Sequence, residues 1–264
     1  MEIKVIIAAH KQYLMPEEDC YLPVQVGRAL HPDVGYTPDN TGDNISEKNP
    51  YYCELTGLYW AWKNLPADVI GLVHYRRYMG KKNGLLGVIK RRKDPLGSIL
   101  DRADIEKLLT KSDIILPTKR EYYIETLYSH YAHTHYAEHL DLTREVLKEL
   151  CPEYVPAFDK VMKRTGGHMF NMFIMKREKC NAYCEFLFPV LQELEKRIDV
   201  SALSSFHARV FGRISELLLD VWIETNHESY VQVPLVNIEK TNWIKKGGAF
   251  LKAKFEKKKY EGSF

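Results

Sequence analysis

Two short apolar runs with a helix-like segment between them constrain the fold of this chain more than any other feature. Residues 3–10 (IKVIIAAH) and 68–79 (DVIGLVHYRRYM) are rich in isoleucine and valine and lack the alternation of a half-exposed strand. This pattern predicts strands that are buried on both faces, as in a parallel sheet. Residues 51–64 have aromatic residues and leucines at helical spacing, with Asn49 as the predicted N-cap and Pro50 as the first helical residue.

The same alternation continues to the end of the chain. Further strands are predicted at residues 113–117, 168–176 and 230–236, and helices at residues 101–111, 123–150, 157–164, 177–198 and 205–224. Strands that alternate with helices indicate an α/β fold with a mostly parallel central sheet flanked by helices. The length of 264 residues, 45% of them hydrophobic, suits one large domain. We expect this domain to cover residues 1–238 and a basic C-terminal tail to cover residues 239–264.

Several protein classes lack their sequence signatures in this chain. The five cysteines are odd in number and form no CxxC pair, which argues against a disulfide framework or a structural zinc site. The motifs GxGxxG, GxxxxGK(S/T) and GxSxG are absent, so dehydrogenase, P-loop and α/β-hydrolase interpretations lack support. The first apolar run is too short for a signal peptide, and no run approaches the roughly 18 residues of a membrane span. We therefore expect a cytoplasmic protein.

Basic residues gather in two segments, although the formal net charge is only +3. Residues 76–93 contain eight lysines or arginines and no acidic residue, and residues 241–260 contain seven lysines and one glutamate. Apolar residues lie among these lysines, a composition that favours attachment to an anionic membrane surface. The alternative for the second segment is a solvated, frayed terminus. Nucleic acid is not an expected partner, because neither segment carries a binding motif and the total charge is low.

Polar and cationic side chains follow the first two predicted strands at their carboxyl ends. His10 and Lys11 follow the first strand, and His74, Arg76 and Arg77 lie at the end of the second. Ligands of open α/β sheets bind at this edge. The guanidinium group is planar, permanently charged and able to bind phosphate oxygens in bidentate fashion. Two arginines at this edge therefore favour a diphosphate ligand over the alternative of surface ion pairs.

Other candidate residues have a structural alternative. Asp43, Asn44 and Ser46 lie in a polar loop that could hydrogen-bond a sugar or a ribose, or could provide only turn and cap contacts. Asn171 starts an apolar strand and either faces sugar hydroxyls or satisfies backbone groups. Glu216 lies at or near the start of a predicted helix, where a carboxylate could act as a general base or could simply be favoured by the helix dipole.

Four histidines cluster in residues 128–139 (YSHYAHTHYAEH). Only His135 and His139 are four residues apart and so share a predicted helix face, and His130 and His133 form a separate pair. No HExxH or comparable metal motif results. We interpret the cluster as a polar, aromatic helix face that contacts an acceptor sugar, with a zinc site as the alternative.

Seven segments, taken together with their spacing, resemble one bacterial protein family. They are AAHKQYLMP, YLPVQVGRAL, TGDNISEKNPYYCELTGLYWAWKN, GLVHYRRYM, DIILPTKR, NMFIMKRE and RVFGRISELLLDVWIE. This family has long been catalogued as a domain of unknown function and is found in capsule, exopolysaccharide and lipopolysaccharide gene clusters. Its members are assigned as glycosyltransferases, including β-galactofuranosyltransferases that use UDP-galactofuranose. The resemblance covers about residues 3–240.

The resemblance implies a GT-A-like nucleotide-sugar domain over residues 1–238. Enzymes of this fold usually hold the donor diphosphate through Mn²⁺ or Mg²⁺ on a D-x-D motif, which this chain lacks. HYRRY stands where that motif is expected, so either His74 helps to hold a metal ion or Arg76 and Arg77 neutralise the diphosphate directly. Glu216 matches the place of the general base in inverting enzymes. The other donor-binding residues that this interpretation assigns are His10, Lys11, Asp43, Asn44, Ser46 and Asn171.

The implied activity is transfer of a hexose from a UDP-sugar to a saccharide acceptor that is lipid-linked, during surface polysaccharide biosynthesis. Such an enzyme is expected on the inner face of the cell membrane as a peripheral protein. The alternatives are a non-catalytic carbohydrate-binding or scaffold protein of a polysaccharide assembly complex, and a metal-dependent hydrolase built on the histidine cluster.

Overall fold

A nine-stranded sheet forms the centre of the molecule in this computed structural model, which describes residues 1–82 and 84–239. The main path of the sheet has the order β10-β6-β9-β4-β1-β2-β3, and along it every strand except β9 runs in the same direction. The fold class predicted from the sequence is therefore confirmed. The strands of this path are β1 (Ile3–Ala9), β2 (Tyr21–Gln25), β3 (Thr37–Pro38), β4 (Val69–His74), β6 (Ile114–Pro117), β9 (Phe173–Lys176) and β10 (Val231–Val233).

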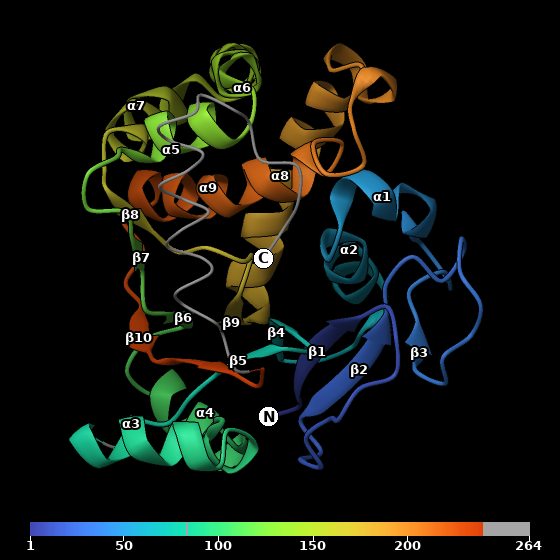
Figure 1. Ribbon diagram of the computed structural model, residues 1–264, viewed down its shortest axis with the longest axis vertical. Helices are drawn as coiled ribbons and strands as arrows, with labels where there is room; N and C mark the ends of the chain where they lie inside the picture. The colour runs from blue at the N-terminus through green and yellow to red at the C-terminus, as the bar shows by residue number, and fades with distance from the viewer. Residues whose placement is uncertain (83, 240–264) are drawn as a thin grey trace.

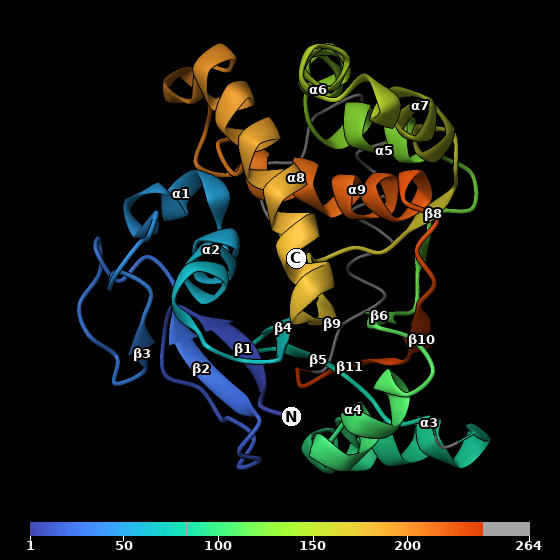
Figure 2. The same ribbon diagram turned by 180° about the vertical axis from the view of Figure 1, so that it is seen from behind.

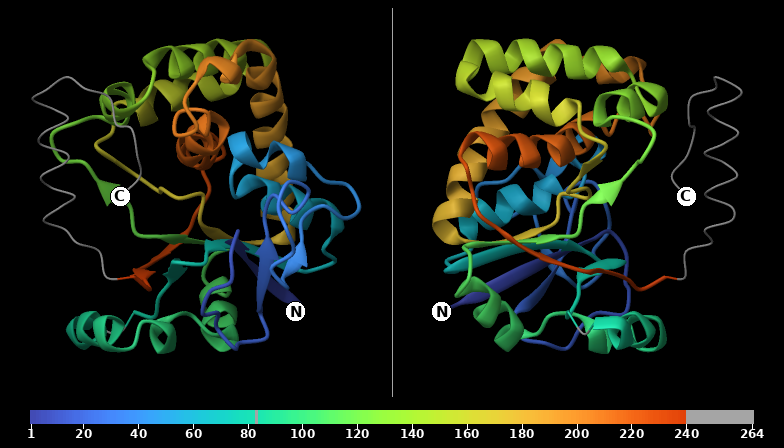
Figure 3. Two further views of the ribbon diagram at one scale, coloured as in Figure 1. Left: turned by 45° about the vertical axis from the view of Figure 1, so that its right-hand side comes forward. Right: turned by 90° about the vertical axis from the view of Figure 1, so that its left-hand side faces the viewer.

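Helices cover both faces of the sheet (Figure 1). α3 and α4 lie on one side, and α2, α8 and α9 lie on the other, with α5, α6 and α7 beyond them, as the views from behind and from the side confirm (Figures 2 and 3). The helices are α1 (Asn49–Tyr52), α2 (Leu55–Asn64), α3 (Gly84–Lys93), α4 (Arg102–Leu109), α5 (Leu127–Thr134), α6 (Ala137–Leu150), α7 (Val155–Met162), α8 (Arg177–Arg197) and α9 (Val210–Thr225).

Successive residues of β1 supply two separate hydrophobic cores. Ile6 and Ala8 belong to the larger core, which includes residues of α2, α8 and α9. Val5 and Ile7 belong to the smaller core, which includes Ile105 of α4. Since successive side chains of a strand point to opposite faces, a strand buried on both faces must be apolar at nearly every position. This burial explains the uninterrupted run that the sequence shows.

The second predicted strand, residues 68–79, is in fact two strands. β4 ends at His74, the chain turns at Tyr75 and Arg76, and β5 (Arg77–Met79) returns antiparallel with Arg77 opposite His74. β5 then pairs with β11 (Leu235–Asn237), so the predicted strand at residues 230–236 is also divided, between β10 and β11. The arginines of HYRRY therefore lie on a tight hairpin rather than on a continuing strand.

The predicted helix at residues 51–64 is likewise interrupted. Cys53 has a φ of 55° and separates α1 from α2. Asn49 lies inside α1 instead of capping it, and its side-chain amide donates to the carbonyl of Cys53 at 2.8 Å. A Cβ added to Gly212 of α9 would meet Cys53 Sγ at 3.1 Å, so this break lets the backbone of residues 52–53 approach α9 closely. Sequence periodicity does not reveal such a tertiary contact.

The predicted basic tail lies outside the described residues beyond Glu239. Among residues 1–82 and 84–239, no helix is both long enough and apolar enough to cross a bilayer.

Candidate active site

The carboxyl ends of β1 and β4 meet because these strands are parallel neighbours. The buried ring of Tyr75, in the hairpin turn, is the common surface for the polar residues that follow both strands. The His10 ring packs edge-on against it with 5.2 Å between centroids, Lys11 Nζ lies 5.6 Å from its centroid, and the Arg76 guanidinium lies 5.0 Å from it. The structure thus brings together these three residues predicted from the sequence.

The electrostatics at this edge favour an anion. Burial lowers the pKa of His10, and the charges of Lys11, Arg76 and Arg209 lower it further. Arg209 was not predicted from the sequence; it immediately precedes α9, and its Nε donates to Cys53 Sγ at 3.1 Å. Arg76 is paired with Glu239 at 3.2 Å, and both side chains are more than 40% exposed, so a multivalent anion can compete for it. A neutral imidazole among three cations suits a diphosphate.

Glu216 lies in the second turn of α9, seven residues into the helix rather than at its start. Burial raises its pKa to about 7, and the negative charge of Glu54 adds to this shift. The backbone N–H of Phe170 and the charges of Arg213 and Arg120 act in the opposite direction. A carboxylate with a pKa near neutrality can accept a proton from a substrate and release it again, as a general base must.

A strained segment before β9 positions this carboxylate. Phe170 and Asn171 have φ values of 76° and 54°, in the left-handed region that side chains larger than glycine rarely adopt. The carbonyl of Phe170 accepts a hydrogen bond from His74 Nε2 at 2.6 Å, while its N–H donates to Glu216. The guanidinium of Arg77 lies 4.4 Å from the Phe170 ring centroid. One residue therefore connects the β4–β5 hairpin to Glu216.

Asn171, which follows Phe170, is the centre of a buried polar network. Its amide nitrogen donates to Glu54 Oε1 at 2.7 Å and to the Gly212 carbonyl at 2.9 Å, and its amide oxygen accepts from Ser215 at 2.7 Å. Asn171 is 2% exposed and Glu54 is 8% exposed. The structure thus places Asn171 beside the predicted base, with its hydrogen-bonding groups turned toward the protein.

The polar loop residues predicted to bind the donor contact three different parts of the protein. Asp43 accepts a hydrogen bond from Tyr59, and its backbone interacts with Asn64, the last residue of α2. Because Glu54 immediately precedes the ten-residue α2, roughly 15 Å of helix separates the two ends. The side chain of Asn44 bonds to Gly42 and Ser46 within its own turn.

Ser46 is fully buried and donates to Asp39, which also accepts from the backbone of Gly27. Gly27 lies two residues beyond β2, and the N–H of Val26 donates to the carbonyl of Ala9 at 3.0 Å, so Ser46 lies close to the sheet edge that carries His10. The contact of the three loop residues with the donor remains a prediction.

The histidine cluster does not share one helix face. His130 and His133 are on α5 and both lie 2.9 Å from the buried carboxylate of Glu125, while His135 ends α5 and contacts Arg213 at 2.6 Å. His139 belongs to α6. The tight turn between the two helices separates His135 and His139, which the sequence placed on one helix. In the part of the chain that the structure describes, no three His, Cys, Asp or Glu side chains are grouped so that they could hold a metal ion.

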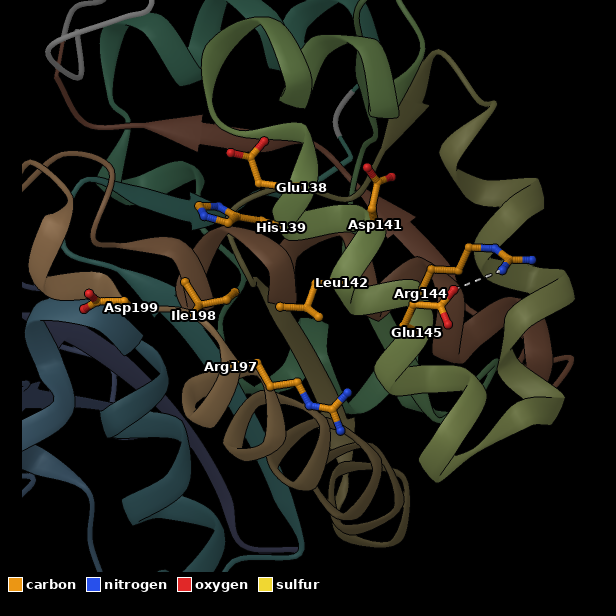
Figure 4. Close-up of a pocket in the computed structure, with 9 residues that line it drawn as sticks. All are labelled: Glu138, His139, Asp141, Leu142, Arg144, Glu145, Arg197, Ile198 and Asp199. Carbon is orange, nitrogen blue, oxygen red and sulfur yellow. Dashed lines mark ion pairs between the residues drawn. The ribbon is translucent and has the colours of Figure 1, made fainter.

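A surface depression of about 650 Å³ lies between α6 and the end of α8. Figure 4 shows its lining, in which Arg144 points toward Glu145 and Arg197 comes from the opposite wall. Arg144 is also paired with Asp159, and Arg197 with Glu149 and Glu193. The depression includes none of the residues predicted from the sequence, and ion pairs within the protein occupy its arginines.

Four charged residues of the site were missed by the sequence analysis. Arg209 and Arg213 have a sequence signal, because they lie seven and three residues before the predicted Glu216 and so share its side of the helical segment. Arg120 follows the predicted strand at residues 113–117, where the strand-end rule could have found it. Glu54 has no comparable signal, because the segment around it reads only as amphipathic helix.

Comparisons with known proteins agree with this architecture. A solved apo structure of WbbM, described as a bifunctional glycosyltransferase, superimposes with a TM-score of 0.81 at 28% sequence identity and covers 91% of this chain. This chain spans 46% of that protein. A search of curated proteins gave no match. The model of the family described as "Domain of unknown function (DUF4422)" matches residues 4–227, and the chain belongs to that family.

Proposed function

We propose that this chain is an inverting glycosyltransferase that moves a hexose, with galactofuranose as a candidate, from a UDP-sugar to a saccharide acceptor. The observation that carries the proposal is the position of Glu216: a carboxylate whose pKa is raised to about 7 lies beside an arginine-rich edge of the sheet. The likeness to WbbM, a bifunctional glycosyltransferase, supports the class of reaction.

In this proposal the cations at the sheet edge hold the donor diphosphate. Lys11, Arg76 and Arg209 surround His10, and Arg77 is fixed against Phe170. Negative charge grows on the diphosphate as the bond to the sugar breaks, so cations already in place stabilise the transition state more than the ground state.

Glu216 accepts the proton of the attacking acceptor hydroxyl. The acceptor oxygen forms a bond to the anomeric carbon as the bond from that carbon to the phosphate oxygen breaks, and UDP leaves with the electron pair. The proton stays on Glu216 until solvent removes it. A single displacement of this kind inverts the configuration at the anomeric carbon.

A divalent metal on the D-x-D motif is usual in GT-A enzymes, and the residues of this chain do not fit it. His74 donates to a backbone carbonyl, and the carboxylate of Glu54 accepts from Asn171. Arginines, rather than carboxylates, follow β4. We therefore assign the neutralisation of the diphosphate to the cationic side chains and derive no step through a metal ion.

The lipid-linked acceptor and the inner membrane surface are also part of the proposal. The segment predicted as a basic loop contains α3, on which Val88 and Ile89 are 46% and 54% exposed. Exposed apolar residues among lysines suit the headgroup region of an anionic membrane. Co-sedimentation with anionic vesicles at low and high salt tests this attachment, and no binding at low salt would exclude it.

The decisive experiment compares Glu216→Gln with the native protein. The variant should bind UDP at least as tightly as the native protein and lose about 10²–10⁴-fold in sugar transfer, because a general base typically contributes that much. Glu106→Gln, on the exposed side of α4 across the sheet, is the matched control. Near-native transfer by Glu216→Gln would show that Glu216 is not the general base. A native protein that binds UDP-sugars but neither hydrolyses nor transfers them would be a carbohydrate-binding or scaffold protein instead.

A further inference from the structure

The segment between β6 and α5, residues 118–126, forms an arm that is anchored at both ends. Its first part, β7 (Arg120–Glu121), pairs with β8 (Gly166–Gly167), and the N–H of Tyr122 donates to the carbonyl of Thr165 at 2.7 Å. At the far end the carboxylate of Glu125, 6% exposed, accepts from two histidines of α5. These contacts fix the direction in which the residues between them project.

The tip of the arm carries the two most exposed large hydrophobic side chains of the described residues. Tyr123 is 83% exposed and Ile124 is 69% exposed. Tyr123 also has a φ of 57°, which costs about 1–2 kcal/mol for a residue with a Cβ. Folding gains nothing from an exposed ring in a strained conformation, so such an outlier points to a function.

The base of the arm lies beside α9, because a Cβ added to Gly167 of its partner strand β8 would meet Asp220 Oδ2, one turn beyond Glu216, at 2.9 Å. The charge of Arg120 lowers the pKa of Glu216. Burial raises the pKa of Tyr122, and the charge of Glu216 adds to that rise. The guanidinium of Arg120 lies 5.0 Å from the Tyr122 centroid, and the Tyr122 ring stacks on His130 at 3.8 Å. The arm therefore starts within the electrostatic reach of Glu216 and leads outward from it.

We propose that Tyr123 and Ile124 form an acceptor subsite, in which the sugar next to the reacting residue packs against the Tyr123 ring. This inference rests on the proposed function. The attacking hydroxyl must come within about 2.6–3.2 Å of its base, Glu216. The cations that follow β1 and β4 occupy the donor side, so the rest of the acceptor extends along the arm. The apolar face of a sugar ring then covers aromatic surface that is otherwise exposed to water.

The test measures transfer to methyl glycosides of a monosaccharide and of disaccharides ending in it, with UDP-galactofuranose or UDP-galactose as donor. Tyr123→Ala should raise the KM for the disaccharide about three- to tenfold and leave the KM for the monosaccharide unchanged, since only the second sugar reaches the arm. Tyr123→Phe, which keeps the ring, should restore the native KM. Leu150→Ala, at a side chain 50% exposed at the end of α6, is the control.

Donor hydrolysis without acceptor separates this inference from the function on which it rests. Tyr123→Ala should hydrolyse the donor at the native rate. An unchanged disaccharide KM together with native hydrolysis would overturn the acceptor subsite and leave the transferase proposal intact. A loss of vesicle binding with an unchanged disaccharide KM would also overturn it, in favour of membrane contact. A native protein with neither hydrolysis nor transfer would overturn the proposed function itself.

Discussion

The two halves of the candidate site are built in different ways. On the donor side, exposed cationic residues follow two neighbouring parallel strands and meet around the ring of Tyr75. On the other side, Glu216 accepts from the backbone N–H of Phe170, next to a buried network that joins Asn171 to Glu54, Gly212 and Ser215. The positions of the donor-side residues follow from sheet topology alone. The positions of the residues in the second half depend on hydrogen bonds that satisfy the buried carboxylate of Glu54 and the buried amide of Asn171.

The largest effect on stability is expected in the buried half. Asn171→Ala removes the amide that donates to Glu54 and the oxygen that accepts from the Ser215 hydroxyl, which leaves the buried carboxylate of Glu54 without this partner. The free energy of unfolding should fall by about 2–3 kcal/mol, measured by denaturant titration. Asn237→Ala, at an exposed position of β11, should change it by less than about 0.5 kcal/mol. Equal losses in both variants would contradict the difference between the two halves.

A smaller effect, on binding rather than on folding, is expected on the donor side. Lysine in place of Arg76, Arg77 or Arg209 keeps the charge but loses the planar fork, so the Kd for UDP should rise about tenfold without a loss of stability. Isothermal titration calorimetry measures this constant. The control is Arg102→Lys, at a residue of α4 that forms an ion pair with Asp19. Native UDP affinity in all three variants would show that the diphosphate lies elsewhere.

The smallest effect is a shift in the pH dependence of sugar transfer. Glu216 must be ionised to act, so kcat/KM should rise with pH through about 7. Glu54→Gln removes a negative charge that raises this pKa, so the rise should move to lower pH, while Glu106→Gln should leave it in place. A rise that stays at the native pH in Glu54→Gln would show that another group titrates.

The stability of the protein should respond to the same ionisation. The pKa of Glu216 is raised in the folded state, so its contribution to stability is complete below about pH 4.5 and is lost as pH rises through about 7. Glu216→Gln should therefore be the more stable protein at pH 8, by roughly 1–3 kcal/mol.

The sequence predicts the donor side better than the rest of the site, and for a physical reason. Continuous apolar runs identify buried strands, and parallel strands place their carboxyl ends together, so His10 and Arg76 could be paired without a structure. The polar loop at Asp43 could not be placed, because loop composition does not say which end of the sheet a loop covers. Asp43 packs against Tyr59 and Asn64, toward the end of α2.

The buried half was only partly predictable. Glu216 was found through family resemblance, whereas Glu54, whose charge raises its pKa, was not, since the two lie 162 positions apart in the sequence (216 minus 54). Asn171 was noted as a single polar residue in an apolar strand, but its left-handed backbone has no signature, because it lacks the glycine that usually marks such conformations. The interruption of the helix at Cys53 was missed for the same reason.

Phe170, which is hydrogen-bonded to both His74 and Glu216, has a consequence for thermodynamic linkage. Phe170 carries hydrogen bonds to both groups and packs against Arg77, so donor binding at the hairpin and proton occupancy at Glu216 act on one rigid unit. We expect an arriving diphosphate to increase the proton affinity of Glu216, and calorimetry of UDP binding in buffers of different ionisation enthalpy would measure that proton uptake. Reciprocity then requires that ionisation of Glu216 lower the affinity for the donor by the same factor. Release of UDP and readiness to deprotonate the next acceptor would thus be two expressions of one coupling free energy.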